Sequence, residues 1–266
     1  MSKPIKSLLV ICALAAAGIA SAQEQVVNLY SARHYPTDEA LYSGFTKATG
    51  IKIQRVDSDD AGIMARLKAD GLFLPVRSKV LEDAIPANLR ATPTADGGIP
   101  WFGLSTRARV IVYNKAKVNK DDVDTYEELG DPKNKGKLCI RSGSHPYNLS
   151  LFGAVTEHMG EQKAEAWLKG VVANLARAPK GGDTDQIKAV AAGECDIAVS
   201  NSYYLARLMR SAKPEDKAVV DKVAVVFPNQ QSWGTHLNIA GGAVARHTKN
   251  QANAIKFLEY LASPEA

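Results

Sequence analysis

The stretch from Asp196 to Arg210 constrains the possible fold most strongly. It begins with a short apolar and β-branched run and then passes through Ser200-Asn-Ser202. Apolar residues follow at helical spacing, at Leu205, Leu208 and Met209. A short apolar run is typical of a buried strand, and Ser or Asn before a helical pattern is typical of a helix start. The pattern predicts a strand that leads directly into a helix, with Tyr203 and Tyr204 in the first helical turn.

Two further predicted strand-to-helix turns carry tyrosine. Tyr147 stands between a strand pattern at 137–141 and a helix pattern at 149–159. Tyr35, with His34 beside it, follows a strand pattern at 26–30 and precedes Pro36, a residue suited to the first turn of a helix. In open α/β sheets ligands bind at the carboxyl ends of strands, and a helix amino end favours an anion such as a phenolate. A packed aromatic is the alternative for each tyrosine taken singly, but the repetition favours a shared binding site.

Strand patterns alternate with helix patterns along the chain, which predicts an α/β fold with largely parallel sheets. Residues 101–114 form the longest strand candidate, interrupted at 105–109, and could pass from one lobe to another. Residues 72–98 hold several prolines and are predicted to be mostly irregular, with a helical turn near 80–85. Asp183-Thr-Asp185 is predicted to cap a helix at 186–192. Other helices are predicted at 36–49, 61–69, 162–175 and 250–261, and other strands at 51–56, 222–227 and 235–241.

The first 22 residues have the three parts of a secretory signal peptide. A basic start is followed by an apolar run at 8–20 and by the small residues Ala20-Ser-Ala22. We expect cleavage after Ala22 and an exported, soluble mature protein that begins at Gln23.

Composition and charge argue against a nucleic-acid partner. The chain is 45% hydrophobic and 23% charged, which is ordinary for a globular protein of one large domain or two lobes. Removal of the leader leaves 31 basic and 28 acidic residues, a formal net charge of +3, without a run of basic residues. That mild charge does not imply nucleic acid.

Cys139 and Cys195 are the cysteines that remain after the leader. An even number of cysteines in an oxidising compartment suggests a disulfide. Each cysteine stands eight residues before a tyrosine of interest, Tyr147 and Tyr203. Two buried free thiols are the alternative. A thiolate metal site is disfavoured because no histidine or acid stands at ligand spacing.

The tyrosines suggest a site for ferric iron. A free tyrosine has a pKa of about 10, so only a strongly polarising cation such as Fe³⁺ holds several phenolates at neutral pH. Softer or divalent metals favour imidazole, thiolate or carboxylate sets. Three or four phenolates bring the ferric complex to a net charge between 0 and −1, and a nearby arginine would offset that negative charge. Arg107 and Arg109 can supply the positive charge; ordinary surface charge is the alternative, more so for Arg109.

Five segments of the chain together resemble the ferric-ion-binding proteins of bacterial ABC iron importers, and the resemblance runs from Gln25 to the end. The segments are Asn28-Leu-Tyr-Ser-Ala-Arg-His-Tyr35, Trp101-Phe-Gly-Leu-Ser-Thr-Arg-Ala-Arg-Val-Ile-Val-Tyr-Asn114, Ser144-His-Pro-Tyr-Asn-Leu-Ser150, Ser200-Asn-Ser-Tyr-Tyr204 and Asn229-Gln-Gln-Ser-Trp-Gly-Thr-His-Leu-Asn238. The resemblance implies Fe³⁺ ligands at Tyr147, Tyr203 and Tyr204, joined from the facing lobe by Tyr35 and His34. It implies that Arg107 compensates the charge.

The resemblance also implies a two-lobed periplasmic binding protein fold, type II-like, with α/β lobes joined by crossing strands and iron in the cleft between them. Lobe 1 would comprise residues 23–107 and 226–266, and lobe 2 residues 108–225. Metal binding would close the lobes by a hinge motion. The implied protein is a periplasmic monomer that delivers Fe³⁺ to an inner-membrane ABC permease. The family usually has a further strand and helix between Gly71 and Leu72, and more helix at the carboxyl end.

Two other functions are alternatives to iron capture. A protein of the same fold could bind another small solute or an oxyanion, with the tyrosines stacking on the ligand or hydrogen-bonding to it. A secreted enzyme is the weakest of the three, because His145 and His236 stand in no recognisable serine or cysteine nucleophile motif. The visible charge-transfer band of a phenolate bound to Fe³⁺ would distinguish the iron protein from both.

Overall fold

The computed structural model describes residues 25–31, 36–57 and 72–266. Outside these ranges lie the predicted signal peptide at 1–22, the helix predicted at 61–69, and the site candidates His34 and Tyr35. Within them, no helix has the length and apolar character needed to cross a membrane.

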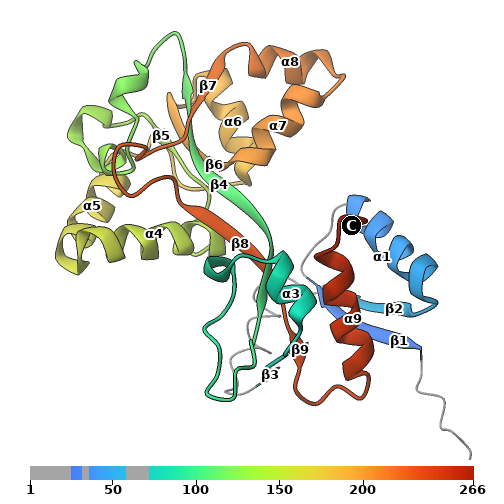
Figure 1. Cartoon of the computed structure of the whole chain (residues 1–266). Coiled ribbons are helices and arrows are strands. Elements are labelled where there is room, and N and C mark those ends of the chain that lie inside the picture. The colour runs from blue at the N-terminus through green and yellow to red at the C-terminus, as the bar shows by residue number, and fades with distance from the viewer. Residues whose placement is uncertain (1–24, 32–35, 58–71) are drawn as a thin grey trace, which may run out of the picture.

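The described chain forms two lobes that are joined by two antiparallel strands (Figure 1). Strand β4 (Phe102–Asn114) pairs with β8 (Leu237–Gly242) over residues 102–108, between the lobes. From Arg109 onward, β4 pairs with two other strands inside lobe 2. The predicted arrangement of lobes joined by crossing strands is confirmed. The predicted interruption at 105–109 is wrong, because pairing with β8 carries the strand through its polar residues, with one register shift between Gly103 and Ser105.

Lobe 1 contains a parallel pair of strands packed against two helices. Strands β1 (Val26–Ser31) and β2 (Lys52–Asp57) pair in parallel. Their apolar side chains meet those of α1 (Pro36–Thr49) and α9 (Gln251–Leu261) in a cluster that includes Val27, Phe45, Ile51 and Phe257. Helix α1 has the bounds that its pattern predicts.

The rest of lobe 1 lies beside the crossing strands. It consists of β3 (Phe73–Leu74), α3 (Lys79–Ala84), a 3₁₀ turn at Ala87–Leu89 and β9 (Val244–Ala245), which pairs with β3. The helical turn predicted near 80–85 is thus confirmed. A second apolar cluster holds this part together, with Val76, Leu81, Ile85, Ile99, Phe102, Val244 and Leu258 at its centre.

Lobe 2 is a sheet with helices on both faces (Figure 1). The sheet has the order β5 (Leu138–Cys139), β6 (Ile197–Asn201), β4, β7 (Val223–Val226). Side chains of β4 alternate between the faces, as strand geometry requires. Ile111 and Tyr113 pack against α4 (Pro146–Met159) and α5 (Glu161–Ala173). Val110 and Val112 pack against α6 (Asp183–Ala192), α7 (Ser202–Arg210) and α8 (Pro214–Val220).

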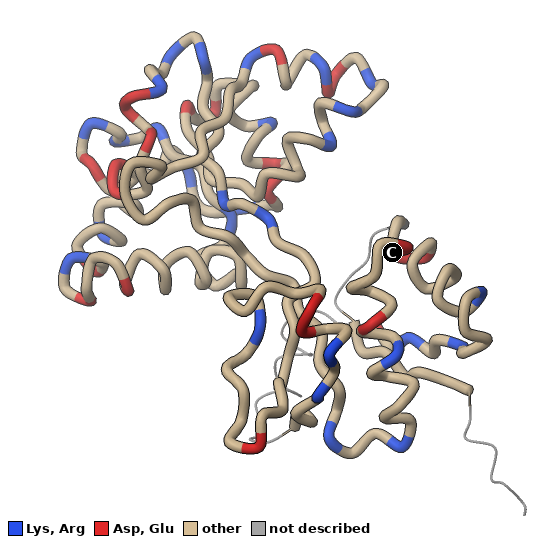
Figure 2. The backbone as a smooth tube through the Cα atoms, in the orientation of Figure 1, with Lys and Arg blue, Asp and Glu red and all other residues tan. Residues whose placement is uncertain are grey.

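The short connections of lobe 2 include three 3₁₀ turns, at Lys120–Asp122, Glu127–Gly130 and Pro132–Asn134. Both signs of charge are spread over each lobe in the described part of the chain (Figure 2).

The prediction of largely parallel sheets is wrong. Among the described strands, only β1 with β2 and β5 with β6 pair in parallel, whereas β4 is antiparallel to β6, β7 and β8. The register gives the reason: Arg109 lies opposite Asn201 and Tyr113 opposite Ile197. Strand β4 therefore runs away from the lobe junction while β6 runs toward it. The carboxyl end of β6, where the Tyr203 turn begins, consequently faces the junction.

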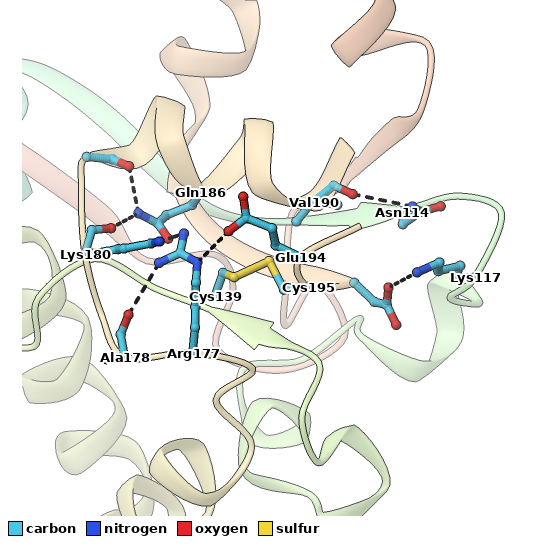
Figure 3. Close-up of a disulfide and its surroundings, with 12 residues drawn as sticks. Asn114, Lys117, Cys139, Arg177, Ala178, Lys180, Gln186, Val190, Glu194 and Cys195 are labelled. Atoms are coloured by element: carbon cyan, nitrogen blue, oxygen red, sulfur yellow. Dashed lines mark hydrogen bonds and ion pairs between the residues drawn. A yellow bond between two sulfur atoms is a disulfide. The ribbon is translucent and has the colours of Figure 1, made fainter. Parts of the chain in front are cut away.

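A disulfide joins Cys139 of β5 to Cys195, which precedes β6 (Figure 3). The two Cα atoms are 5.9 Å apart, within the usual range for a bridge. Both residues are buried. The predicted disulfide is confirmed. It ties the end of β5, which leads to Tyr147, to the segment that enters β6, which leads to Tyr203.

Reduction of this disulfide should destabilise the protein. The bridge spans 56 residues of chain, so it restricts the unfolded state, and its loss should lower the free energy of unfolding by about 2–4 kcal/mol. Urea unfolding with and without a thiol reductant measures the difference. A Cys139→Ala, Cys195→Ala double variant serves as the control, because reductant should not change its unfolding midpoint. Equal midpoints for the oxidised and reduced wild-type protein would contradict the expectation.

Candidate metal centre

A cleft of about 2490 Å³ is lined by residues of both lobes. Lobe 1 contributes Tyr30 and Ser31, at the carboxyl end of β1. Lobe 2 contributes three of the predicted ligands, Tyr147, Tyr203 and Tyr204. Arg107, on the crossing part of β4, lines the same cleft. The fold therefore gathers onto one surface four of the residues that the sequence singled out.

Tyr147 lies in the first turn of α4, and local capping fixes its position. The helix begins at Pro146, and the Nδ1 atom of His145 accepts a hydrogen bond from the Tyr147 amide at 3.2 Å. The His145 ring stands edge-on to the Tyr147 ring, with 4.5 Å between their centroids. A proline at the first helical position is favourable because its missing N–H would have no partner in the helix. His145 thus acts as a helix cap beside Tyr147.

Tyr203 and Tyr204 lie in the first turn of α7, immediately after β6. The predicted strand-to-helix turn is confirmed. Leu205 and Leu208 are buried against the sheet, which fixes the helix, and Tyr204 packs at the edge of the same cluster. The two tyrosine rings are 4.2 Å apart at their centroids. Both side chains are half-buried, so each ring is held by its neighbours and still borders the cleft.

Three guanidinium groups surround the ring of Tyr147. The central carbons of Arg107, Arg109 and Arg141 lie 5.2, 5.9 and 5.1 Å from the ring centroid. Positive groups at this range are attracted to the face of an aromatic ring. They also place positive charge where a set of phenolates would need compensation. Arg107 therefore lies beside the candidate ligand Tyr147, and Arg141 lies beside the same ring.

Arg109 is fully buried, so the interpretation of this residue as surface charge is wrong. Its Nη1 atom lies 2.5 Å from Oδ2 of Asp183, and both side chains are inaccessible to solvent. The guanidinium also donates to the Oδ1 atoms of Asn148, at 2.7 Å, and Asn201, at 3.3 Å. Burial lowers the pKa of Arg109, and the charge of Asp183 opposes that shift. A single sequence shows no signal of this burial, because it depends on partners 39 to 92 residues away.

Asp183 also differs from its prediction. The cap predicted at Asp183-Thr-Asp185 is confirmed at Asp185, which completes a capping box with Gly182, but not at Asp183. Asp183 is the first residue of the helix, and its carboxylate contacts other partners. Its Oδ2 atom accepts from the amide of Asn201 at 2.7 Å, and its Oδ1 atom lies 3.3 Å from Nη1 of Arg141. Asp185 makes the local contact instead, accepting from the Gly182 amide at 2.7 Å.

His236 and Ser150 form a contact that the sequence does not indicate. Their Nε2 and Oγ atoms lie 2.8 Å apart, between the start of β8 and helix α4. Burial, with a further contribution from the charge of Arg109, lowers the pKa of His236. A nucleophilic serine needs a histidine that a third group orients. Among the described residues, the hydrogen bonds of His236 that involve a side chain join it to Ser150 and to the hydroxyl of Tyr126, and none of them joins it to a carboxylate.

Two polar residues that support the tyrosines, Asn148 and Asn201, are not predicted from the sequence. Asn148 directly follows Tyr147, and Asn201 stands two residues before Tyr203. An asparagine close to a tyrosine in each turn is the signal that could have indicated them. Over the described residues no group of three or more histidine, cysteine, aspartate or glutamate side chains is arranged to hold a metal ion.

Comparison with known proteins identifies the family of this chain. The model of the bacterial extracellular solute-binding protein family matches residues 69–266. Iron uptake protein A1 of Synechocystis sp. is 43% identical over 92% of this chain and 73% of its own length. Iron uptake protein A2 of the same organism is 45% identical over 93% of this chain and 76% of its own length.

Solved structures agree with the sequence relatives. A Trichodesmium protein in complex with iron and citrate superposes with a TM-score of 0.80 and 48% identity, covering 91% of this chain and 82% of its own. The ferric binding protein from Campylobacter jejuni superposes with a TM-score of 0.81 and 37% identity, covering 90% and 82%. The resemblance predicted from the sequence is confirmed: the chain belongs to the bacterial extracellular solute-binding protein family, among its iron uptake and ferric-ion-binding members.

Proposed function

We propose that this protein captures Fe³⁺ in the cleft between its lobes, through the phenolates of Tyr147, Tyr203 and Tyr204. The observation that carries the proposal is the convergence of these three tyrosines, from the starts of two helices, on one cleft with Arg107 over the ring of Tyr147. Phenolate is a hard anionic oxygen donor, which suits the small, highly charged ferric ion. The similarity to a protein solved with iron and citrate supports the same cargo.

Lobe 1 completes the proposed site with Tyr35, His34 or both. Strand β1 supports this assignment, because Tyr30 and Ser31 at its carboxyl end line the cleft and the two candidates follow a few residues later. A ligand from each lobe would make the bound ion a bridge across the cleft. Metal binding would then favour the closed arrangement of the lobes, with β4 and β8 as the hinge.

Charge balance supports the role given to Arg107. Three phenolates neutralise Fe³⁺, and a fourth leaves the complex with one negative charge. The half-buried guanidinium of Arg107 lies where it can offset that charge. Because the cleft is partly shielded from water, the attraction is stronger there than between fully exposed groups.

The protein would deliver its cargo as a periplasmic monomer to an inner-membrane ABC permease for iron. A binding protein of this kind holds its ion without chemical change, and so we propose no enzymatic activity. The predicted cleavage after Ala22 would release it into the periplasm. The expected lobe limits, residues 23–107 with 226–266 and residues 108–225, need one adjustment. Val226 ends β7 in the lobe 2 sheet and Trp233 packs in the same core, so we propose that lobe 2 extends to His236 and that lobe 1 resumes with β8.

Replacement of Tyr203 and Tyr204 by phenylalanine should remove iron binding. Tyr→Phe keeps the ring and its packing but deletes the donor oxygen, so it separates ligation from folding. The wild-type protein loaded with Fe³⁺ should show a visible phenolate-to-iron band, and the Tyr203→Phe, Tyr204→Phe double variant should lose or shift it. Absorption spectra recorded during titration with ferric nitrilotriacetate measure both the band and the affinity.

Tyr113→Phe is the matched control for this experiment. Tyr113 lies on β4 like Arg107, but its side chain is buried in the core of lobe 2. Its replacement should leave the band and the affinity unchanged. If the double variant bound Fe³⁺ with an unaltered spectrum, the assignment of these two tyrosines as ligands would fail. If the wild-type protein showed no ferric band, a site for another small solute or oxyanion would replace the proposal.

Iron binding should release protons and should weaken as the pH falls. A phenol carries its proton at neutral pH, and each tyrosine that coordinates Fe³⁺ must lose that proton. We expect Tyr204→Phe to release about one proton fewer than the wild type when both are saturated from the same ferric chelate at the same pH. A pH-stat measurement gives the difference directly. Equal proton release by the two proteins would show that Tyr204 does not bind as a phenolate.

A further inference from the structure

We propose that the buried Arg109–Asp183 ion pair positions the candidate metal centre by locking its two tyrosine-bearing turns together. The proposal rests on the function proposed above and concerns residues that do not themselves bind the ion. Arg109 and Asp183 act as positioning residues, through Asn148 on one side and Asn201 on the other. Their joint effect is to fix Tyr147 relative to Tyr203 and Tyr204 before the cation arrives.

The Arg109 guanidinium reaches both turns at once. One nitrogen, Nη2, donates to Asn148 at 2.7 Å, and the other, Nη1, reaches Asp183 at 2.5 Å and Asn201 at 3.3 Å. A planar guanidinium presents its donors in a fixed fork, so its partners are held at set angles as well as distances. All four side chains are buried, which keeps water from replacing these contacts.

Asn148 carries the contact to the Tyr147 turn. Its Oδ1 atom accepts from Arg109, while its Nδ2 atom donates to the carbonyl oxygens of Arg141 and Ser142 at 3.0 and 3.1 Å. The loop before α4 is thereby fastened to the residue that follows Tyr147. A shift of the start of α4 relative to β4 would consequently break the buried hydrogen bond between Arg109 and Asn148.

Asp183 carries the contact to the Tyr203 turn. Its Oδ2 atom bonds both Arg109 and the backbone amide of Asn201, the last residue of β6. Its Oδ1 atom pairs with Arg141, whose guanidinium lies over the Tyr147 ring. One carboxylate therefore connects α6, the end of β6 and the loop before α4.

Stability alone does not account for this arrangement. Burial of two charges carries a large desolvation cost, and apolar residues of similar size often stabilise a fold equally well. The pair is better explained by geometry, because a preorganised ligand set avoids the cost of ordering the ligands during binding. Replacing residues that orient metal ligands typically costs about 10–100-fold in metal affinity.

Asn148→Ala tests the proposal, with Asn174→Ala as its matched control. Asn174 is also a buried asparagine of lobe 2, and its Nδ2 atom likewise donates to two carbonyl oxygens, those of Leu129 and Asp131 at 3.0 and 2.7 Å. Both variants lose two hydrogen bonds to loop carbonyls, so both should lose stability in urea. Only Asn148 also contacts Arg109 beside a tyrosine turn.

The expected result is a difference between the variants in iron binding and in the spectrum. Titration of each full-length protein with ferric nitrilotriacetate, at a temperature where both are folded by circular dichroism, should show about 10–100-fold weaker binding and a shifted band for Asn148→Ala. Asn174→Ala should match the wild type in both. If Asn148→Ala also matches the wild type, or if the two variants change alike, the positioning role is overturned.

Arg109→Lys provides the second test if Asn148→Ala does not fold. Lysine keeps a positive charge against Asp183, but its single ammonium group lacks the fork that reaches Asn148 and Asn201 together. A folded Arg109→Lys protein should show the same weaker binding and shifted band, and wild-type behaviour would refute the proposal. Wild-type protein that shows no ferric band would instead refute the proposed function itself, and this inference with it.

Discussion

Strand β4 is the constraint on which the rest of the structure depends. One half of it pairs with β8 between the lobes, and the other half forms the middle of the lobe 2 sheet. Because the strand is continuous, Arg107 in the cleft and Arg109 in the buried network keep a fixed spacing along one backbone. Any hinge motion of the lobes acts on the same element that carries both arginines.

Arg107 and Arg109 both lie near Tyr147, but they differ in burial and therefore in the role that we propose for them. The half-buried Arg107 can offset the negative charge of a bound iron complex directly, because it borders the cleft. Fully buried Arg109 is already balanced by Asp183, and so its charge is committed to the fold. The disulfide adds a covalent tie between the end of β5 and the segment before β6, the strands that lead to Tyr147 and Tyr203.

The parts predictable from the sequence were those that depend on local pattern. Helix 36–49, the strand-to-helix turn before Tyr203 and the cysteine pair each follow from neighbouring residues or from simple counting. The alternation of helices and strands does not predict strand direction, because it does not show that β4 enters lobe 2 from the junction and runs opposite to β6. The roles of Arg109 and Asp183 were missed for a similar reason: a charged residue in a strand or at a helix start is ordinarily exposed, and only the tertiary fold buries these two.

Under the proposed function, the distribution of ligands between the lobes determines the order of binding. Lobe 2 alone would supply three phenolates from turns that one buried network holds together. A ferric ion could therefore bind first to lobe 2, with the lobes still apart, and closure would add the ligand from lobe 1. Release would follow the reverse course, because opening removes only that last ligand and leaves the three phenolates in place. An importer that merely separated the lobes would face an ion still held by lobe 2, so transfer would also require a competing ligand or protonation of the phenolates.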